Sequence, residues 1–324
     1  MTQVIYVGID MSKDRFDAAC CLERKATQLG RYDNVAQGFQ KLAHAVPLKP
    51  AMAETPSIHL IVEPTGGYEQ QLVAFAFEQG WRISLPNPKQ VRDWARGMGV
   101  RAKNDPLDSR TLAEFGAMSN PMPENCLAAG VGELDTLLRR REDLEQMLQN
   151  ERNRRHALDY KPHASPAAKE SLDRMIEMLK KELEQVEEAI QRLLDQHTEL
   201  QSDTRLLLTV CGIGPKTVLP ILVFLYRWQA RTAGRGSAKG LVAFAGLDPQ
   251  EHRSGDSVFK RPTISKMGCG FTRRRLYLAA KGGVRARSGP LRHFYDRLRG
   301  RGKAYTLALI ASARKILVLS LIHI

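Results

Sequence analysis

The hydrophobic pattern of the first 125 residues alternates between short β-branched runs and stretches of helical spacing. VIYVGID (4–10) and FDAACCL (16–22) predict two paired strands, and IHLIVEP (58–64) predicts a buried strand of parallel type. Two glycines break the chain at 66–67, and residues 68–80 then follow helical spacing, before WRISLPNP (81–88) predicts another short strand. This order of elements indicates an α/β sheet domain over residues 1–125.

From Leu134 the hydrophobic period becomes that of long helices, which predicts a helical coiled-coil arm over residues 126–203. Its main seam alternates spacings of four and three residues: Leu172, Ile176, Leu179, Leu183, Val186, Ile190 and Leu193. A weaker leucine series starting at Leu134 is interrupted by Arg141, and YKPHASP (160–166) separates the two helices. The pattern fits an antiparallel hairpin that packs on itself and an arm that joins subunits equally well.

A glycine turn between two apolar helices opens the last region, residues 204–324, which we expect to be mainly α-helical. LLLTVCGIGPKTVLPILVFL (206–225) has the form of a helix-hairpin-helix. A turn whose backbone N–H groups point outward at a helix N-terminus binds phosphate, so Gly212, Gly214, Lys216 and Thr217 are candidate contacts to a DNA backbone. The alternative is a tight turn whose glycines only let the two helices pack.

The charge of the chain is concentrated at its C-terminal end. The 324 residues carry a net charge of +14, whereas the last 72, from Arg253, carry 17 basic side chains against Asp256 and Asp296 alone. Such a block is typical of a nucleic-acid-binding surface, and interleaved aromatic residues favour a folded surface over the alternative of a solvated basic tail. The candidate contacts here are Lys260, Arg261, Lys266, Arg273, Arg274 and Arg275.

The five cysteines form no CxxC pair and no Cys/His set with metal-ligand spacing, which argues against a zinc ribbon and a disulfide scaffold. The N-terminus lacks the pattern of a secretory signal, and no run of about 18 purely apolar residues occurs. We therefore expect a protein of the reducing cytoplasm that has no membrane partner.

Four carboxylates have contexts that differ from a solvated surface. Asp10 and Glu63 each end a predicted strand, while Asp105 lies near a helix N-cap and Asp108 follows on the same helical face. Two hard divalent cations, Mg²⁺ or Mn²⁺, need such carboxylate ligands when they act on a phosphodiester. Each acid alone also has a structural explanation, as an N-cap, a helix-dipole partner or a loop cap.

At these residues the sequence resembles a known family. The motifs are residues 7–17, 62–69 and 87–115, followed by GIGPKTVLPIL (212–222), LVAFAGLDPQEHRSGDS (241–257) and RRRLYLAA (273–280). In chain order they resemble bacterial insertion-sequence transposases whose N-terminal domain is similar to the Holliday-junction resolvase RuvC, with a four-acid DEDD site. The resemblance extends to the recombinases guided by a bridge RNA and runs from about residue 4 to about residue 315. The chain departs from the family where it stops in the apolar run KILVLSLIHI, since family members usually continue with a polar segment.

The resemblance implies an RNase H/RuvC-like N-terminal domain in which Asp10, Glu63, Asp105 and Asp108 hold two Mg²⁺ ions. It also implies a nucleophilic serine at Ser254, which the residues alone do not distinguish from the other serines near the basic block. The expected partners are donor and target DNA, a structured guide RNA and further copies of the chain in a dimer or tetramer, with acids and serine supplied by different subunits. We expect the protein at the bacterial nucleoid.

Two other functions fit the same residues. A metal-dependent endonuclease of the Holliday-junction type would use the four acids to activate water, with Ser254 as an ordinary loop residue. A catalytically idle nucleic-acid-binding scaffold would use neither the acids nor the serine.

Overall fold

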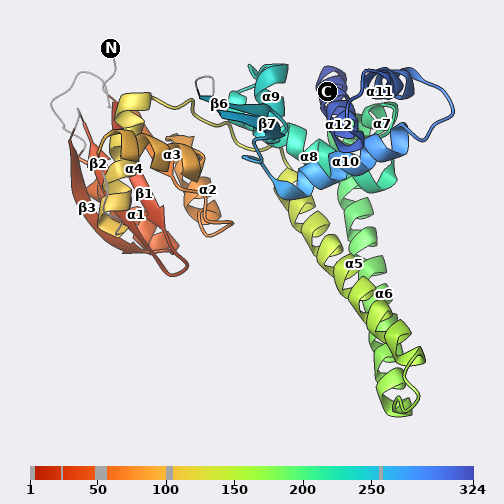
Figure 1. Cartoon of the computed structure of the whole chain (residues 1–324). Helices are drawn as coiled ribbons and strands as arrows, with labels where there is room; N and C mark the ends of the chain where they lie inside the picture. Colours follow the sequence, from red (N-terminus) through yellow and green to blue (C-terminus); the bar gives the residue numbers. More distant parts are fainter. Residues whose placement is uncertain (1–3, 23–24, 48–56, 100–104, 255–257) are drawn as a thin grey trace. The chain divides into compact units, whose positions relative to one another are not determined.

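The computed structural model describes residues 4–22, 25–47, 57–99, 105–254 and 258–324, with the backbone alone for residues 105–107, 251–254 and 258–262. The chain forms two compact units (Figure 1). Unit 1 comprises Met1–Cys126 with Gln229–Arg235, and unit 2 comprises Leu127–Trp228 with Gly236–Ile324. The N-terminal unit is α/β and the C-terminal region is largely helical, as the sequence predicts.

Unit 1 is built on a five-stranded mixed sheet of order β3-β2-β1-β4-β5. The strands are β1 (Val4–Met11), β2 (Arg15–Cys21), β3 (Ala26–Asp33), β4 (Ser57–Val62) and β5 (Arg82–Ser84). β2 runs antiparallel to its neighbours β1 and β3, whereas β4 runs parallel to both β1 and β5. The predicted strands are confirmed, and β3 is an addition to them.

Helices cover both faces of this sheet. The helices of unit 1 are α1 (Ala36–Ala45), α2 (Gln70–Glu78), α3 (Pro88–Gly97) and α4 (Asp105–Ser119). Phe39 of α1 and Leu72 of α2 share a core with Ile9 of β1, whereas Leu112 of α4 and Val91 of α3 share a core with Ile61 of β4. The second of these two sheet faces is called the α4 face below.

Unit 2 begins with a hairpin of two long helices, α5 (Val131–Asp159) and α6 (Pro166–Gln196), which lie side by side (Figure 1). Toward the free end of the hairpin the seam is filled within the chain by Leu144, Leu148, Ile176 and Leu179. Arg141, which interrupts the leucine series, is only 8% exposed. The two helices therefore bury their apolar seam against each other.

The rest of unit 2 packs around the base of this hairpin. Its elements are α7 (Thr198–Leu208), α8 (Pro215–Thr232), α9 (Ala238–Phe244), β6 (Pro249–Ser254), β7 (Val258–Ile264), α10 (Gly270–Gly283), α11 (Pro290–Gly300) and α12 (Tyr305–His323). The antiparallel pair β6-β7 is an addition to the predicted helical region. A large core joins Leu134 and Ile190 of the hairpin to Leu222 of α8 and Ile316 of α12.

Helix α12 is the one helix in the described part of the chain that is long and apolar enough to cross a membrane by length and composition, with a mean hydropathy of 1.7. Its sequence contains no purely apolar run of about 18 residues, because Arg314 and Lys315 interrupt it. Leu309, Ile316 and Leu317 are fully buried in the core of unit 2. One face of α12 thus packs in unit 2, and 39% of its apolar window is buried.

Candidate functional site

Two of the candidate acids lie on neighbouring central strands of unit 1. Asp10 is near the end of β1 and Glu63 directly follows β4. The two strands are parallel, with Ile9 opposite Val62, and the Glu63 N–H donates to the Ile9 carbonyl oxygen at 3.4 Å. Asp10 and Glu63 are therefore adjacent across the sheet, and strand alternation puts both on the α4 face with Ile61.

Helix α4 crosses this face in close contact with β1. At Gly8 an added Cβ would lie 2.1 Å from the Ser109 carbonyl oxygen, whereas at Gly116, nearer the end of α4, it would lie 2.6 Å from Ile61 Cγ1. Tyr6, two residues before Gly8 on β1, lies at the other end of α4: a Cβ at Gly116 would be 3.0 Å from Tyr6 Cδ1, and the Tyr6 hydroxyl donates to Asn120 Oδ1. Helix α4 therefore runs antiparallel to β1. The start of α4, which carries Asp105 and Asp108, therefore lies at the strand ends that carry Asp10 and Glu63.

The donor chemistry of this corner fits a hard divalent cation, because carboxylate oxygens are the ligands that Mg²⁺ and Mn²⁺ take from proteins. The side chain of Asp105 lies outside the described residues. Among the side chains that are described, no three His, Cys, Asp or Glu residues are grouped closely enough to hold a metal ion. The metal-binding role of the four acids thus stays a prediction.

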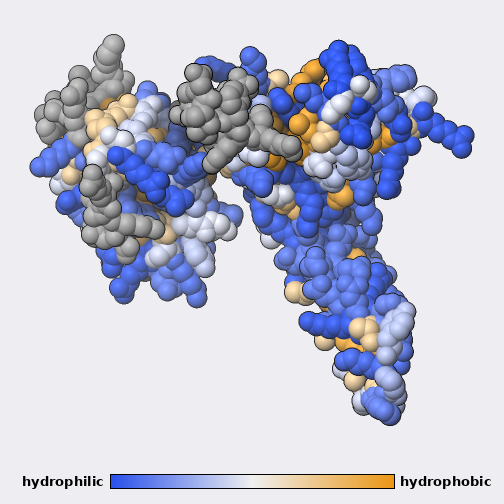
Figure 2. Space-filling model, viewed as in Figure 1, coloured by the Kyte–Doolittle hydropathy of each residue, from blue (hydrophilic) through white to orange (hydrophobic). Residues whose placement is uncertain are grey.

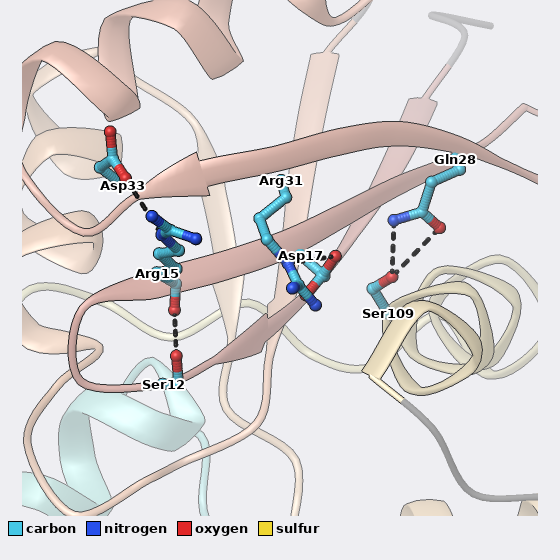
Figure 3. Close-up of polar contacts among 7 residues, drawn as sticks. All are labelled: Ser12, Arg15, Asp17, Gln28, Arg31, Asp33 and Ser109. Carbon is cyan, nitrogen blue, oxygen red and sulfur yellow. Dashed lines mark hydrogen bonds and ion pairs between the residues drawn. The ribbon is translucent and has the colours of Figure 1, made fainter.

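A fifth acid, Asp17, belongs to the same corner and was not predicted. It lies on β2 directly opposite Asp10 and is only 8% exposed. The Arg31 guanidinium on β3 donates to Asp17 Oδ2 from Nη2 at 2.8 Å and from Nε at 3.0 Å (Figure 3). The sequence indicates the orientation of Asp17 only through strand alternation. Asp17 lies two and four residues before Ala19 and Cys21, so it faces the same side of the sheet as these residues, which pack against α4.

Hydrogen bonds fix the start of α4 to β3. The Ser109 hydroxyl and the Gln28 side-chain amide lie 3.4 Å apart, so that Asp108 directly precedes an anchored residue (Figure 3). One turn further on, Glu114 accepts a hydrogen bond from the Ala26 N–H at 3.2 Å. These contacts hold α4 at the short distance from β1 that the missing side chain of Gly8 permits.

The loop after Glu63 is held by a buried carboxylate. Glu69 Oε2 accepts hydrogen bonds from the Thr65 N–H at 3.2 Å, the Thr65 hydroxyl at 2.8 Å and the Gly67 N–H at 3.0 Å. Burial alone would raise the pKa of Glu69, but these hydrogen bonds together hold that pKa below its ordinary value. The Asn34 amide also donates to the Tyr68 carbonyl at 3.1 Å, which ties this loop to the β3-α1 junction.

The candidate nucleophile lies in unit 2. Ser254 is the last residue of β6, and its backbone pairs with Val258 of β7. Lys260 and Arg261 lie on β7, but their side chains and that of Ser254 are outside the described residues. Lys266 follows the hairpin with a positive φ of 54°, and its N–H donates to the Gly246 carbonyl.

The turn between α7 and α8 is tightly packed within unit 2. Gly212 has a φ of 96°, and a Cβ there would lie 2.7 Å from the Ala279 carbonyl oxygen of α10. The Gly214 N–H donates to Thr217 Oγ1 at 3.0 Å, so this amide is already used inside the turn. The geometry favours the packing explanation for Gly212. Lys216 is exposed, and its phosphate contact stays a prediction.

The three consecutive arginines of α10 have partners inside unit 2. Arg273 donates to the Gly268 and Ala245 carbonyls, and Arg274 forms an ion pair with Glu142. Arg275 is 7% exposed and lies 3.6 Å from the Glu145 carboxylate. These side chains link α10 to its loop and to α5, and their contact with nucleic acid stays a prediction.

Comparison with known proteins identifies the class and then the family. Residues 7–159 match the profile of DEDD-type transposases of the IS110 group, described as "Transposase", and residues 204–296 match the "Transposase IS116/IS110/IS902 family". The chain is therefore an enzyme that acts on DNA, of the transposase and recombinase class.

Relatives extend this match over nearly the whole chain. A "Pilin gene-inverting protein" of Moraxella bovis is 31% identical over 315 residues, which cover 97% of this chain and 94% of the relative. A protein of the same name from Moraxella lacunata has the same identity and coverage. The chain belongs to the IS110 family of DEDD transposases, and the resemblance that the motifs carry is confirmed.

Proposed function

We propose that the protein cuts and rejoins DNA strands with two divalent cations on Asp10, Glu63, Asp105 and Asp108 and with Ser254 as nucleophile. The observation that carries the proposal is the adjacency of Asp10 and Glu63 at the carboxyl ends of two parallel strands, at the start of α4. Acids at the carboxyl ends of neighbouring strands are what the resemblance to RuvC implies, and this adjacency supports the proposal. Family membership supports the reaction class.

The chain's own groups have distinct tasks in this reaction. The carboxylates hold Mg²⁺ or Mn²⁺, which stabilises charge on the attacking and leaving oxygens of the phosphodiester. The Ser254 hydroxyl releases its proton as its oxygen bonds to phosphorus, the bond from phosphorus to the displaced strand breaks, and the displaced oxygen takes up a proton to leave as a hydroxyl end. A hydroxyl of the new partner strand then attacks the phosphoserine, which restores the serine and forms one phosphodiester for each one broken. No ATP is required.

Nucleic acid is the expected partner in two forms, namely donor and target DNA and a structured guide RNA. The net charge of +15 from Arg253 onward supports binding to phosphate backbones, which depends on charge and shape more than on base sequence. We place the protein in the bacterial cytoplasm at the nucleoid.

We also propose that the protein acts as a dimer or tetramer, in which one subunit supplies the acids and another the serine. The seam between α5 and α6 is filled within the chain, so a second subunit would use the outer faces of the hairpin. The face of the hairpin seen in Figure 2 is mainly hydrophilic with scattered apolar residues. Among the large apolar residues of the hairpin, Met147, Met175 and Met178 are exposed.

The decisive experiment traps the product on the protein. With DNA that carries the element's ends, we expect a covalent protein–DNA adduct that Ser254→Ala abolishes and Ser257→Ala retains. Asp105→Asn should abolish cleavage, whereas Asp33→Asn should not, because Asp33 is an exposed acid at the end of β3, outside the proposed site. Free 5′-phosphate ends without an adduct would instead identify a hydrolytic endonuclease.

The guide is tested separately. Nucleic acid extracted from the purified protein and sequenced should contain one recurrent structured RNA. Recombination should depend on adding that RNA back to protein stripped of nucleic acid. RNA-independent recombination by the stripped protein would refute this part of the proposal.

A further inference from the structure

Four charged side chains form a row across the α4 face of unit 1. Arg31, Asp17 and Asp10 are opposite one another on β3, β2 and β1, and Glu63 continues the row beyond β4. Neighbouring strands are about 4.8 Å apart, so each position of the row lies one strand spacing from the next along the backbone. The row thus places three acidic positions and then an arginine position next to one another.

The Arg31–Asp17 pair is held by several hydrogen bonds. Arg31 contacts both oxygens of the carboxylate, since Nε lies 3.3 Å from Oδ1 and 3.0 Å from Oδ2. The Asp17 side chain is 11% exposed and that of Arg31 is 49% exposed, so the pair reaches from the buried sheet to its rim. A two-point contact of this kind fixes the direction of both groups.

The pair has an ordinary counterpart on the same two strands. Arg15 and Asp33 are also opposite each other, at 3.5 Å, but their side chains are 63% and 65% exposed (Figure 3). An exposed single-contact pair is screened by water and contributes little. It therefore provides a matched control for charge changes on β2 and β3.

We propose that Asp17 and Arg31 are positioning residues that set the charge beside Asp10, and hence the affinity of the acid corner for divalent cations. This inference rests on the proposed function, because it assigns the cations to Asp10 and its companions. Arg31 holds the Asp17 carboxylate away from the cation, so that a fifth acid next to Asp10 neither becomes a ligand nor adds its full charge. Asp17 in turn holds the guanidinium away from Asp10, where its charge would compete with the metal.

The two halves of the pair are therefore expected to act in opposite directions. Asp17→Asn leaves a cation beside Asp10, so the dissociation constant for Mn²⁺ should rise about tenfold. Arg31→Gln leaves an additional carboxylate, so Mn²⁺ should bind about fivefold more tightly or with one more ion per chain. The double variant has lost both charges and should return to within about threefold of the parent.

The test measures the binding of Mn²⁺ to the full-length protein without DNA. Calorimetry and the electron paramagnetic resonance signal of free Mn²⁺ both report the dissociation constant. Arg15→Gln and Asp33→Asn should leave the dissociation constant within about twofold of the parent. A purely structural ion pair would make both single variants weaker binders, in proportion to the stability lost in urea unfolding. Changes of the same sign, or no change beyond twofold, would overturn the inference.

Asp10→Asn separates failure of the inference from failure of the proposed function. If Asp10→Asn abolishes Mn²⁺ binding while the pair variants have no effect, the pair has no positioning role and the acid corner remains. If Mn²⁺ binds Asp10→Asn as it binds the parent, the acid corner is wrong and the inference falls with it. If Asp17→Asn fails to fold, the inference is tested with Arg31→Gln and with Arg31→Lys, which keeps the positive charge. Arg31→Lys should bind Mn²⁺ with the dissociation constant of the parent.

Discussion

The close approach of α4 to β1 makes Gly8 the most sensitive backbone position of the acid corner. Gly8→Ala adds one methyl group, which would lie 2.1 Å from the Ser109 carbonyl oxygen and 2.3 Å from the Ala113 nitrogen. Both neighbours are backbone atoms, so no side chain can rotate to make room. The helix itself has to move.

The size of that movement follows from the contact distance. Ordinary contact begins at 3.4 Å, so the start of α4 must shift by more than 1 Å. The hydrogen bond between Ser109 of α4 and Gln28 of β3 opposes this shift. Overpacking of this kind costs about 3 kcal/mol in the free energy of unfolding. A displacement of about 1 Å in an active site lowers the rate by about 100-fold, here through Asp105 and Asp108.

Urea unfolding of unit 1 and strand cleavage at saturating Mg²⁺ measure the two effects. Gly97→Ala is the matched control, because Gly97 ends α3 and an added Cβ there meets nothing within 4 Å. It should leave both quantities nearly unchanged. Retention of full stability and cleavage by Gly8→Ala would show that α4 does not position the acids.

Three further predictions concern residues around the site and the turn of unit 2. Burial lowers the pKa of His59 to about 4, from 6.5 in the unfolded chain, so only the unfolded state gains the proton as pH falls through this interval. The free energy of unfolding of unit 1, measured in urea, should therefore fall by about 2 kcal/mol between pH 7 and pH 4.5, and His59→Gln should remove this pH dependence. Because the pKa of Glu69 is lowered in the folded state, the ionised carboxylate stabilises the fold fully above pH 4.5, and this stabilisation is lost as pH falls through the folded-state pKa. Glu69→Gln should therefore lower the free energy of unfolding by about 1–2 kcal/mol at pH 7 and by less below pH 4. In unit 2, Gly212→Ala should lower thermal stability, whereas Lys216→Gln should leave stability unchanged and reduce the salt dependence of DNA binding by about one unit of slope.

The strands that the sequence predicts are those with a strong apolar pattern. β1, β2 and β4 are buried on both faces, so each has a continuous hydrophobic run in the sequence. Such a run can be recognised as a strand without knowing which strand it pairs with. The two acids that end β1 and β4 were predictable for the same reason, because the end of a buried run is easily located. Parallel pairing then brings Asp10 and Glu63 together.

The elements that the sequence did not predict have weak local patterns. β3 carries polar residues at most positions and contains Gly30, so neither face of it alternates clearly. β6 and β7 each contain a proline and two charged residues, which suggest a loop rather than a strand. Their pairing depends on partners elsewhere in the fold, which propensity along a single segment does not reveal.

The Arg31–Asp17 pair was beyond sequence analysis because it depends on one irregularity in β3. Residues 28 and 31 are three apart, so in a regular strand they would face opposite sides of the sheet. A β-bulge between the partners of Ala18 and Ala19 shifts the register by one residue, with Gly30 at a φ of 141°. Gln28 and Arg31 consequently both reach the α4 face, where one anchors the start of α4 and the other holds Asp17. The placement of α4 and the charge beside Asp10 therefore depend on the same extra residue in an edge strand.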